Sequence, residues 1–183
     1  MVFGNCLTEG VIGLRMKKIS SIVVNRFFLL CTVFLIVAAD QGIKNIVENS
    51  EVGSVIFRLS PLFEVIHTKN HGTAFSMFSG KQTLILIVTT AMLLLLATVM
   101  LVYSRLTNAA RWSIALMLAG GVGNWIDRIS VGGVTDYICT LFIRFPVFNL
   151  ADICITLSSV VLFFLVVLGK FEFNPEETHG RTN

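Results

Sequence analysis

The chain has 183 residues, of which 55% are hydrophobic and only 14% are charged. A soluble domain carries about 25% charged residues, and a chain with a mean hydropathy of +0.82 would expose large apolar patches in water. The net charge of +3 is small and the basic residues are scattered, which argues against a nucleic-acid-binding protein. Length and composition therefore indicate a membrane protein with a single domain.

Four segments are apolar over the roughly 20 residues that a helix needs to cross a bilayer. They cover residues 22–43, 82–104, 112–129 and 152–169. The first resembles a signal peptide because Met16-Lys17-Lys18 precedes it. No clear small-residue cleavage site comes before Asp40, so we expect this segment to be a retained helix.

The two ends of the chain differ from the apolar segments. Residues 1–15 are a doubtful extension without strong periodicity, and we expect translation to start at Met16. Residues 16–170 are predicted to form one four-helix membrane domain. The polar residues 171–183 are predicted to form a disordered cytoplasmic tail.

Basic residues predict the orientation, because Lys and Arg are enriched in cytoplasmic loops. They gather before the first span, between the second and third spans, and after the fourth. Both termini are therefore predicted to be cytoplasmic, and loops 45–81 and 130–149 to face outward. Residues 53–60 and 63–68 are rich in β-branched and aromatic side chains, which predicts a small hairpin on the outer surface. Residues 72–78 are predicted to form a short interfacial helix.

The chain has four aspartates, and this topology places all of them at the outer face. Asp40 and Asp127 have a neighbouring base, Lys44 and Arg128 respectively, which favours local ion pairs and a structural role. Asp136 and Asp152 have no basic residue within four positions. If the fold brings these two together, they must share a proton, as in an aspartic-protease dyad.

Alternative interpretations of single residues stay open. Asp152 is also suited to stabilise the start of the fourth helix through the helix dipole. Asn149 fits two roles equally well, a cap of that helix or a ligand of the substrate backbone. Gly120, Gly121 and Gly123 favour close helix packing, whereas Asn124 and Arg128 on the same helix indicate a polar site.

Five ordered motifs between Asp40 and Asp152 resemble the lipoprotein signal peptidases, also called signal peptidase II. They are, in chain order, Asp40-Gln41-Gly42-Ile43-Lys44, Asn70-His71-Gly72-Thr73-Ala74-Phe75, Gly123-Asn124-Trp125-Ile126-Asp127-Arg128, Val134-Thr135-Asp136-Tyr137-Ile138 and Phe148-Asn149-Leu150-Ala151-Asp152. The resemblance implies that Asp136 and Asp152 are the catalytic dyad. It also implies that the supporting or substrate-binding residues are Asp40, Lys44, Asn70, Gly72, Ala74, Phe75, Asn124, Asp127, Arg128 and Asn149.

The resemblance further implies an aspartic endopeptidase of the bacterial inner membrane that needs no metal or organic cofactor. Its expected substrates are diacylglyceryl-modified prolipoproteins, cleaved just before the lipidated cysteine, and its expected surroundings are membrane lipid, with the enzyme a monomer. The outer hairpin and residues 72–78 would close over the substrate. The main alternative is a small ion-coupled transporter that uses paired carboxylates. A non-enzymatic assembly factor would leave the dyad unexplained, and no Gly-x-Ser-x-Gly element supports a serine protease.

Overall fold

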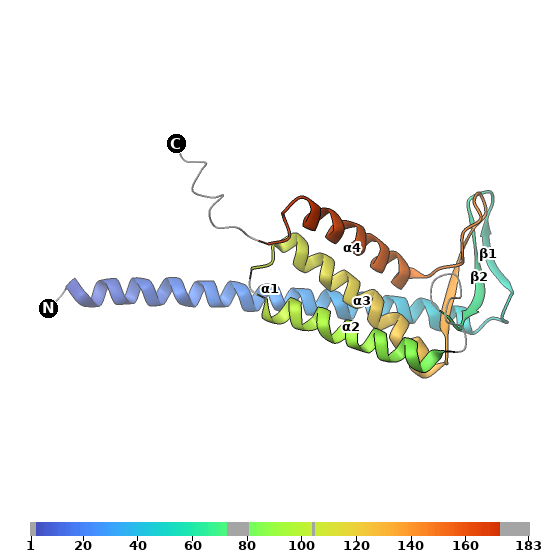
Figure 1. The fold of residues 1–183 in the computed structure, drawn as a ribbon, viewed down its shortest axis with the longest axis horizontal. Helices are drawn as coiled ribbons and strands as arrows, with labels where there is room; N and C mark the ends of the chain where they lie inside the picture. The colour runs from blue at the N-terminus through green and yellow to red at the C-terminus, as the bar shows by residue number, and fades with distance from the viewer. Residues whose placement is uncertain (1–2, 73–80, 104, 173–183) are drawn as a thin grey trace.

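Four helices lie side by side and a small sheet covers one end of them (Figure 1). The computed structural model describes residues 3–72, 81–103 and 105–172, with side chains from Asn25 onward. The helices are α1 (Phe3–Glu48), α2 (Gln82–Val102), α3 (Asn108–Ser130) and α4 (Leu150–Val167). The N-terminal part of α1 extends beyond the other helices on the side away from the sheet, which is also the side where α4 ends (Figure 1).

Three stretches of helix in this part of the chain are long and apolar enough to cross a membrane, namely Asn25–Glu48, Gln82–Val102 and Leu150–Val167. They coincide with three of the four predicted spans. The first predicted span, residues 22–43, lies within α1, which is a longer helix that runs without a break from Phe3 to Glu48. Large apolar side chains such as Phe34, Leu94 and Phe163 are more than 60% exposed on these helices, as expected for surfaces that face lipid.

The fourth predicted span corresponds to α3, which is a helix of 23 residues but does not reach the apolarity of the other three. The reason is its position, since α3 packs against α1, α2 and α4. Its buried face therefore carries small and polar residues, among them Ala115, Ala119, Asn124 and Asp127, in place of the long aliphatic side chains that contact lipid.

The sheet has three antiparallel strands in the order β1 (Val55–Leu59), β2 (Phe63–Asn70) and β3 (Val134–Thr140). The predicted hairpin is β1 and β2. The third strand was not predicted, because residues 134–140 were assigned to an outer loop. In the observed register Thr68 faces Asp136 and Asn70 faces Val134, so Asn70 and Asp136 are diagonal neighbours on one face of the sheet.

The apolar core and the polar residues occupy opposite ends of the bundle. The core cluster lies at the end remote from the sheet and consists of Leu29, Met100, Leu106, Ala110, Ile114, Ala115 and Leu118. At the sheet end the buried side chains are mostly polar or charged, and they include Asp40, Lys44, Asn124, Asp127, Asp136 and Asn149. Such groups are buried at a net cost unless they are paired, which directs attention to their partners. The predicted interfacial helix over residues 72–78 lies almost wholly outside the described residues.

Candidate active site

The four aspartates come from four different elements and meet at the sheet end of the bundle. Asp40 is near the end of α1, Asp127 is in the last turns of α3, Asp136 is on β3 and Asp152 is in the first turn of α4. Gly132, with a φ of +72°, lies between α3 and β3. That left-handed conformation suits glycine and turns the chain back, so that β3 returns along the helices.

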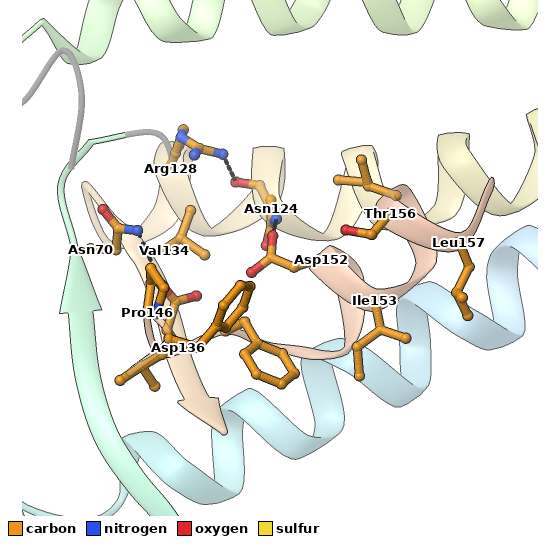
Figure 2. Close-up of a pocket in the computed structure, with 14 residues that line it drawn as sticks. Asn70, Asn124, Arg128, Val134, Asp136, Pro146, Asp152, Ile153, Thr156 and Leu157 are labelled. Carbon is orange, nitrogen blue, oxygen red and sulfur yellow. Dashed lines mark hydrogen bonds between the residues drawn. The ribbon is translucent and has the colours of Figure 1, made fainter. Parts of the chain in front are cut away.

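Asp136 and Asp152 line the same cavity, which has a volume of about 430 Å³ (Figure 2). One wall is polar and contains both aspartates with Asn70, Asn124 and Arg128. The remaining lining is apolar except for one threonine, and consists of Val134, Phe145, Pro146, Val147, Phe148, Ile153, Ile155, Thr156 and Leu157. A pocket with few convergent polar groups in an apolar lining is typical of a binding site.

Uncharged amides hold both carboxylates. Asn70 Nδ2 donates to Oδ2 of Asp136 at 3.1 Å, and Asn149 Nδ2 donates to Oδ1 at 2.7 Å. Asn124 Nδ2 donates to Oδ1 of Asp152 at 2.7 Å, and the Asn149 backbone N–H donates to Oδ2 at 3.2 Å. Each of the four oxygens thus accepts a hydrogen bond, and within the described residues neither aspartate takes part in an ion pair.

Asn149 joins the helix start to the site. Its side-chain oxygen accepts a hydrogen bond from the Asp152 backbone N–H at 2.9 Å, while the Asp152 carboxylate accepts from the Asn149 N–H, which completes a capping box. The capping role predicted for Asn149 is therefore confirmed. Because the oxygen is used by the cap, the Nδ2 group is left pointing at Asp136 and at Oδ1 of Asn124, 3.1 Å away.

Lys44 orients the side-chain amide of Asn124 in the same way. Its Nζ donates to Oδ1 of Asn124 at 2.9 Å. Since the Asn124 oxygen faces the ammonium group, its NH₂ group must face Asp152. Lys44 is 2% exposed, and its charge is balanced by Asp40 and Asp127, each 2.8 Å from Nζ.

This arrangement corrects one predicted pair. The ion pair of Asp40 with Lys44 is present, but Asp127 pairs with Lys44 and not with its sequence neighbour Arg128. Arg128 instead donates through Nη1 to the Asn124 carbonyl at 3.0 Å and through Nη2 to the Gly72 carbonyl at 3.3 Å. Gly72 is thereby bound to Arg128, which lines the pocket. Ala74 and Phe75 of the same predicted motif lie outside the described residues.

Electrostatics distinguish Asp136 from an ordinary carboxylate. Burial, followed by the nearby Asp152 carboxylate, raises the pKa of Asp136 to about 6 from the usual 3.8, although the hydrogen bonds from Asn70 and Asn149 act in the opposite direction. Two carboxylates in one partly desolvated pocket do not both ionise readily, so the pair retains one proton at a higher pH than a lone aspartate would. Chemically, such a pair is suited to general acid–base catalysis.

Small residues let the helices approach closely enough to assemble these contacts. A Cβ on Gly120 would clash with the Ala151 carbonyl oxygen, and one on Gly123 would lie 2.5 Å from Oδ2 of Asp40. Packing of α3 against α4 and α1 at this distance therefore requires glycine at both positions. The same closeness allows Ala151 N–H to donate to Oδ1 of Asp40 at 3.1 Å.

The family described as signal peptidase (SPase) II matches residues 32–168, which is most of the chain and includes every residue of the pocket. The chain belongs to the signal peptidase II family. This is a family of membrane aspartic peptidases, and together with the candidate spans it assigns the chain to the bacterial inner membrane. The family assignment favours a peptidase over the transporter that the carboxylates alone also allowed.

Curated relatives and solved structures agree with the family. The chain is 35% identical to the lipoprotein signal peptidase of Lactococcus lactis subsp. lactis, over 85% of this chain and 98% of the relative. It is 30% identical to that of Streptococcus pneumoniae, over 78% and 92%. A bacterial membrane enzyme solved by the in meso method at 2.3 Å superposes with a TM-score of 0.72 at 27% identity, covering 76% of this chain and 87% of that one.

Some residues of this signal peptidase II site were not among the predicted site residues. Gln41 donates to Oδ1 of Asp127 at 2.8 Å and to the Gly123 carbonyl at 3.1 Å. Thr135 is fully buried, and its N–H donates to Oδ2 of Asp127 at 3.2 Å. Gln41 adjoins Asp40 in the first motif, so the motif itself was a usable signal. The lining residues 145–147 carried no such signal, because an apolar loop looks the same whether it covers a pocket or faces lipid.

Proposed function

We propose that Asp136 and Asp152 are the catalytic pair of an endopeptidase that cleaves prolipoproteins just before a diacylglyceryl-modified cysteine. The observation that carries this proposal is that two aspartates from β3 and α4 share one pocket, where amide groups are their hydrogen-bond donors in the described part of the chain. The rest of the pocket wall is apolar, which suits a lipid-modified peptide. The names of the relatives, lipoprotein signal peptidases, support this substrate class.

The chemistry follows from a pair that holds one proton. The ionised aspartate removes a proton from water as the water oxygen attacks the scissile carbonyl carbon, and the protonated aspartate donates its proton to the carbonyl oxygen. When the tetrahedral intermediate collapses, the carbon–nitrogen bond breaks and the leaving amine takes up a proton from the pair. The two residues titrate as a unit, so we assign the base to the pair and not to one member.

The supporting residues have matching roles. Asn70, Asn124 and Asn149 hold the two carboxylates, and Lys44 with its two aspartates orients Asn124. Arg128 lines the pocket and binds the Gly72 carbonyl, and the motif that continues through Ala74 and Phe75 would contact the substrate there.

We also propose that α3 is a fourth membrane span. In this arrangement both termini lie in the cytoplasm, and the sheet and the pocket lie at the outer face. The active form is a monomer in contact with membrane lipid. The positions of the basic residues and the three-sided packing of α3 support this arrangement.

The proposal is tested with purified protein in lipid nanodiscs and a diacylglyceryl-modified prolipoprotein, followed by gel shift. Asp136→Asn and Asp152→Asn should each reduce the cleavage rate at least about a thousandfold, because the pair loses its exchangeable proton or its base. Glu51→Gln, an exposed carboxylate that does not line the pocket, is the matched control and should cleave like the wild type. The same prolipoprotein with an unmodified cysteine should not be cleaved.

Near-normal turnover by either folded aspartate variant would refute the assigned catalytic pair. Equal cleavage of lipidated and unmodified substrate would refute the substrate class while leaving the chemistry intact.

A further inference from the structure

Among the described residues, the apolar wall of the pocket contains one hydroxyl group, that of Thr156. Thr156 follows Asp152 by four residues on α4, so its side chain lies on the same helix face, about 6 Å further along the axis. Ile153 and Leu157 flank it, and Figure 2 shows its oxygen on the side of the pocket that faces Asp152.

Within the described chain the hydroxyls of Thr83, Thr89 and Thr156 in the helices make no hydrogen bond, and of these three residues only Thr156 lines the pocket. Thr32, Thr90 and Thr98 each donate to the carbonyl four residues earlier, at 2.9, 2.7 and 2.7 Å. This is the usual way in which a helical hydroxyl is satisfied in apolar surroundings. Thr156 makes no such bond to the Asp152 carbonyl, nor any other hydrogen bond to the described part of the chain. Its donor is therefore available in the pocket.

We propose that the Thr156 hydroxyl is a substrate-positioning group that donates a hydrogen bond to a carbonyl oxygen of the bound lipopeptide. The inference rests on the proposed function. When substrate fills the pocket and excludes water, the hydroxyl must find an acceptor or remain unsatisfied. The uncharged acceptors that a lipidated peptide offers are the carbonyls of its backbone and of its acyl esters.

Both kinds of carbonyl can reach Thr156 when the scissile bond is at the aspartates. In an extended peptide, a spacing of about 6 Å corresponds to about two residues. The ester groups of a diacylglyceryl chain follow the cysteine sulfur within a few bonds, and the acyl chains beyond them would lie against Leu157 and the apolar lining. The experiment therefore has to distinguish an ester carbonyl from a peptide carbonyl as the acceptor of the Thr156 hydrogen bond.

The experiment measures kcat and KM for Thr156→Val and Thr156→Ser with a diacylglyceryl lipopeptide in nanodiscs. Valine matches threonine in shape but lacks the hydroxyl. We expect it to raise KM about 5- to 20-fold with little change in kcat, because the bond is made in the bound and the transition state alike. Serine retains the hydroxyl and should stay within about twofold of the wild type. Thr98→Val, which removes a hydroxyl bonded within α2, is the matched control.

A dialkyl ether analogue of the lipopeptide identifies the acceptor, since it lacks the ester carbonyls. If the ester accepts the bond, Thr156→Val and the wild type will have equal KM for the ether substrate. If a peptide carbonyl accepts it, the difference between the two enzymes will persist. Equal KM of Thr156→Val and wild type for the ester substrate would overturn the proposal. Failure of the wild type to cleave the lipopeptide would instead refute the proposed function.

Discussion

Lys44 is a buried cation held between two carboxylates, and its ammonium group also determines which way the Asn124 amide points. The Lys44 ammonium thus pairs with one aspartate of α1 and one of α3. It also orients the Asn124 amide, which donates to Asp152. Removing one partner from a buried charge cluster destabilises a fold far more than removing an exposed ion pair, because the remaining buried charges stay desolvated and uncompensated.

At this scale we predict the effect of Lys44→Met, which keeps the length and apolar stem of the side chain. It leaves Asp40 and Asp127 buried without their cation and should destabilise the fold by about 3–5 kcal/mol. Arg58→Met is the matched control, because Arg58 is 57% exposed in its pair with Glu64 and such pairs contribute about 0–1 kcal/mol. Thermal unfolding in one detergent compares the two variants, and equal stability would contradict the role given to Lys44.

Among the elements, α3 and α4 form the contact on which the site geometry depends. The helices approach so closely at Gly120 that an added methyl group would meet the Ala151 backbone oxygen and the Ile155 side chain. A backbone carbonyl in a helix has no room to move aside. Any side chain at this position must therefore separate the two helices, and with them Asn124 and Asp152.

The corresponding prediction compares two glycine-to-alanine changes. Gly120→Ala should destabilise the protein by about 1–3 kcal/mol through overpacking and reduce cleavage strongly, because Asn124 moves away from Asp152. Gly42→Ala on α1 meets nothing within 4 Å and should be neutral or stabilise by up to about 1 kcal/mol through helix propensity. Melting temperature and cleavage rate are measured for both. If Gly120→Ala behaves like Gly42→Ala, the close approach is not essential.

For the whole molecule, the proposed orientation places the sheet and pocket at the outer face and the opposite end of the bundle in the cytoplasm. Arg105, before α3, and Arg144, after β3, are both exposed, and they lie at opposite ends of α3. Their accessibility from the two sides of the membrane therefore tests whether α3 crosses it.

We predict opposite labelling of two single-cysteine proteins built on a cysteine-free background. Arg144→Cys should react with a membrane-impermeant maleimide added to intact spheroplasts, whereas Arg105→Cys should react only after the membrane is permeabilised. The physical reason is that lipid around α3 separates the two residues. Glu51→Cys, an exposed site at the sheet end, is the positive control and should react from outside. Labelling of both test sites from the same side would exclude α3 as a span.

Local sequence patterns predicted the helices and contacts that are formed by residues close together in the chain. The apolar segments predicted three spans, and the spacing of Asp40 and Lys44 predicted their ion pair. The partner of Asp127 was predicted wrongly, because Lys44 is far away in sequence and the contact arises only when α1 packs on α3. The strand β3 was missed because its first four residues are all buried, so the alternation that marks a half-exposed strand is absent.

The double use of Asn149 has a consequence for inhibitors of this enzyme. Asn149 caps α4 and also holds Asp136, and Asn124 is likewise tied into the buried cluster of charges. An inhibitor that binds to Asp136 and Asp152 in the pocket would contact carboxylates held by two amides that the fold itself requires. A resistant variant altered at either amide would lose stability along with drug binding. Resistance substitutions would then be confined to the apolar lining around Ile153 and Leu157. An inhibitor that makes few contacts with these residues would lose little affinity through such substitutions.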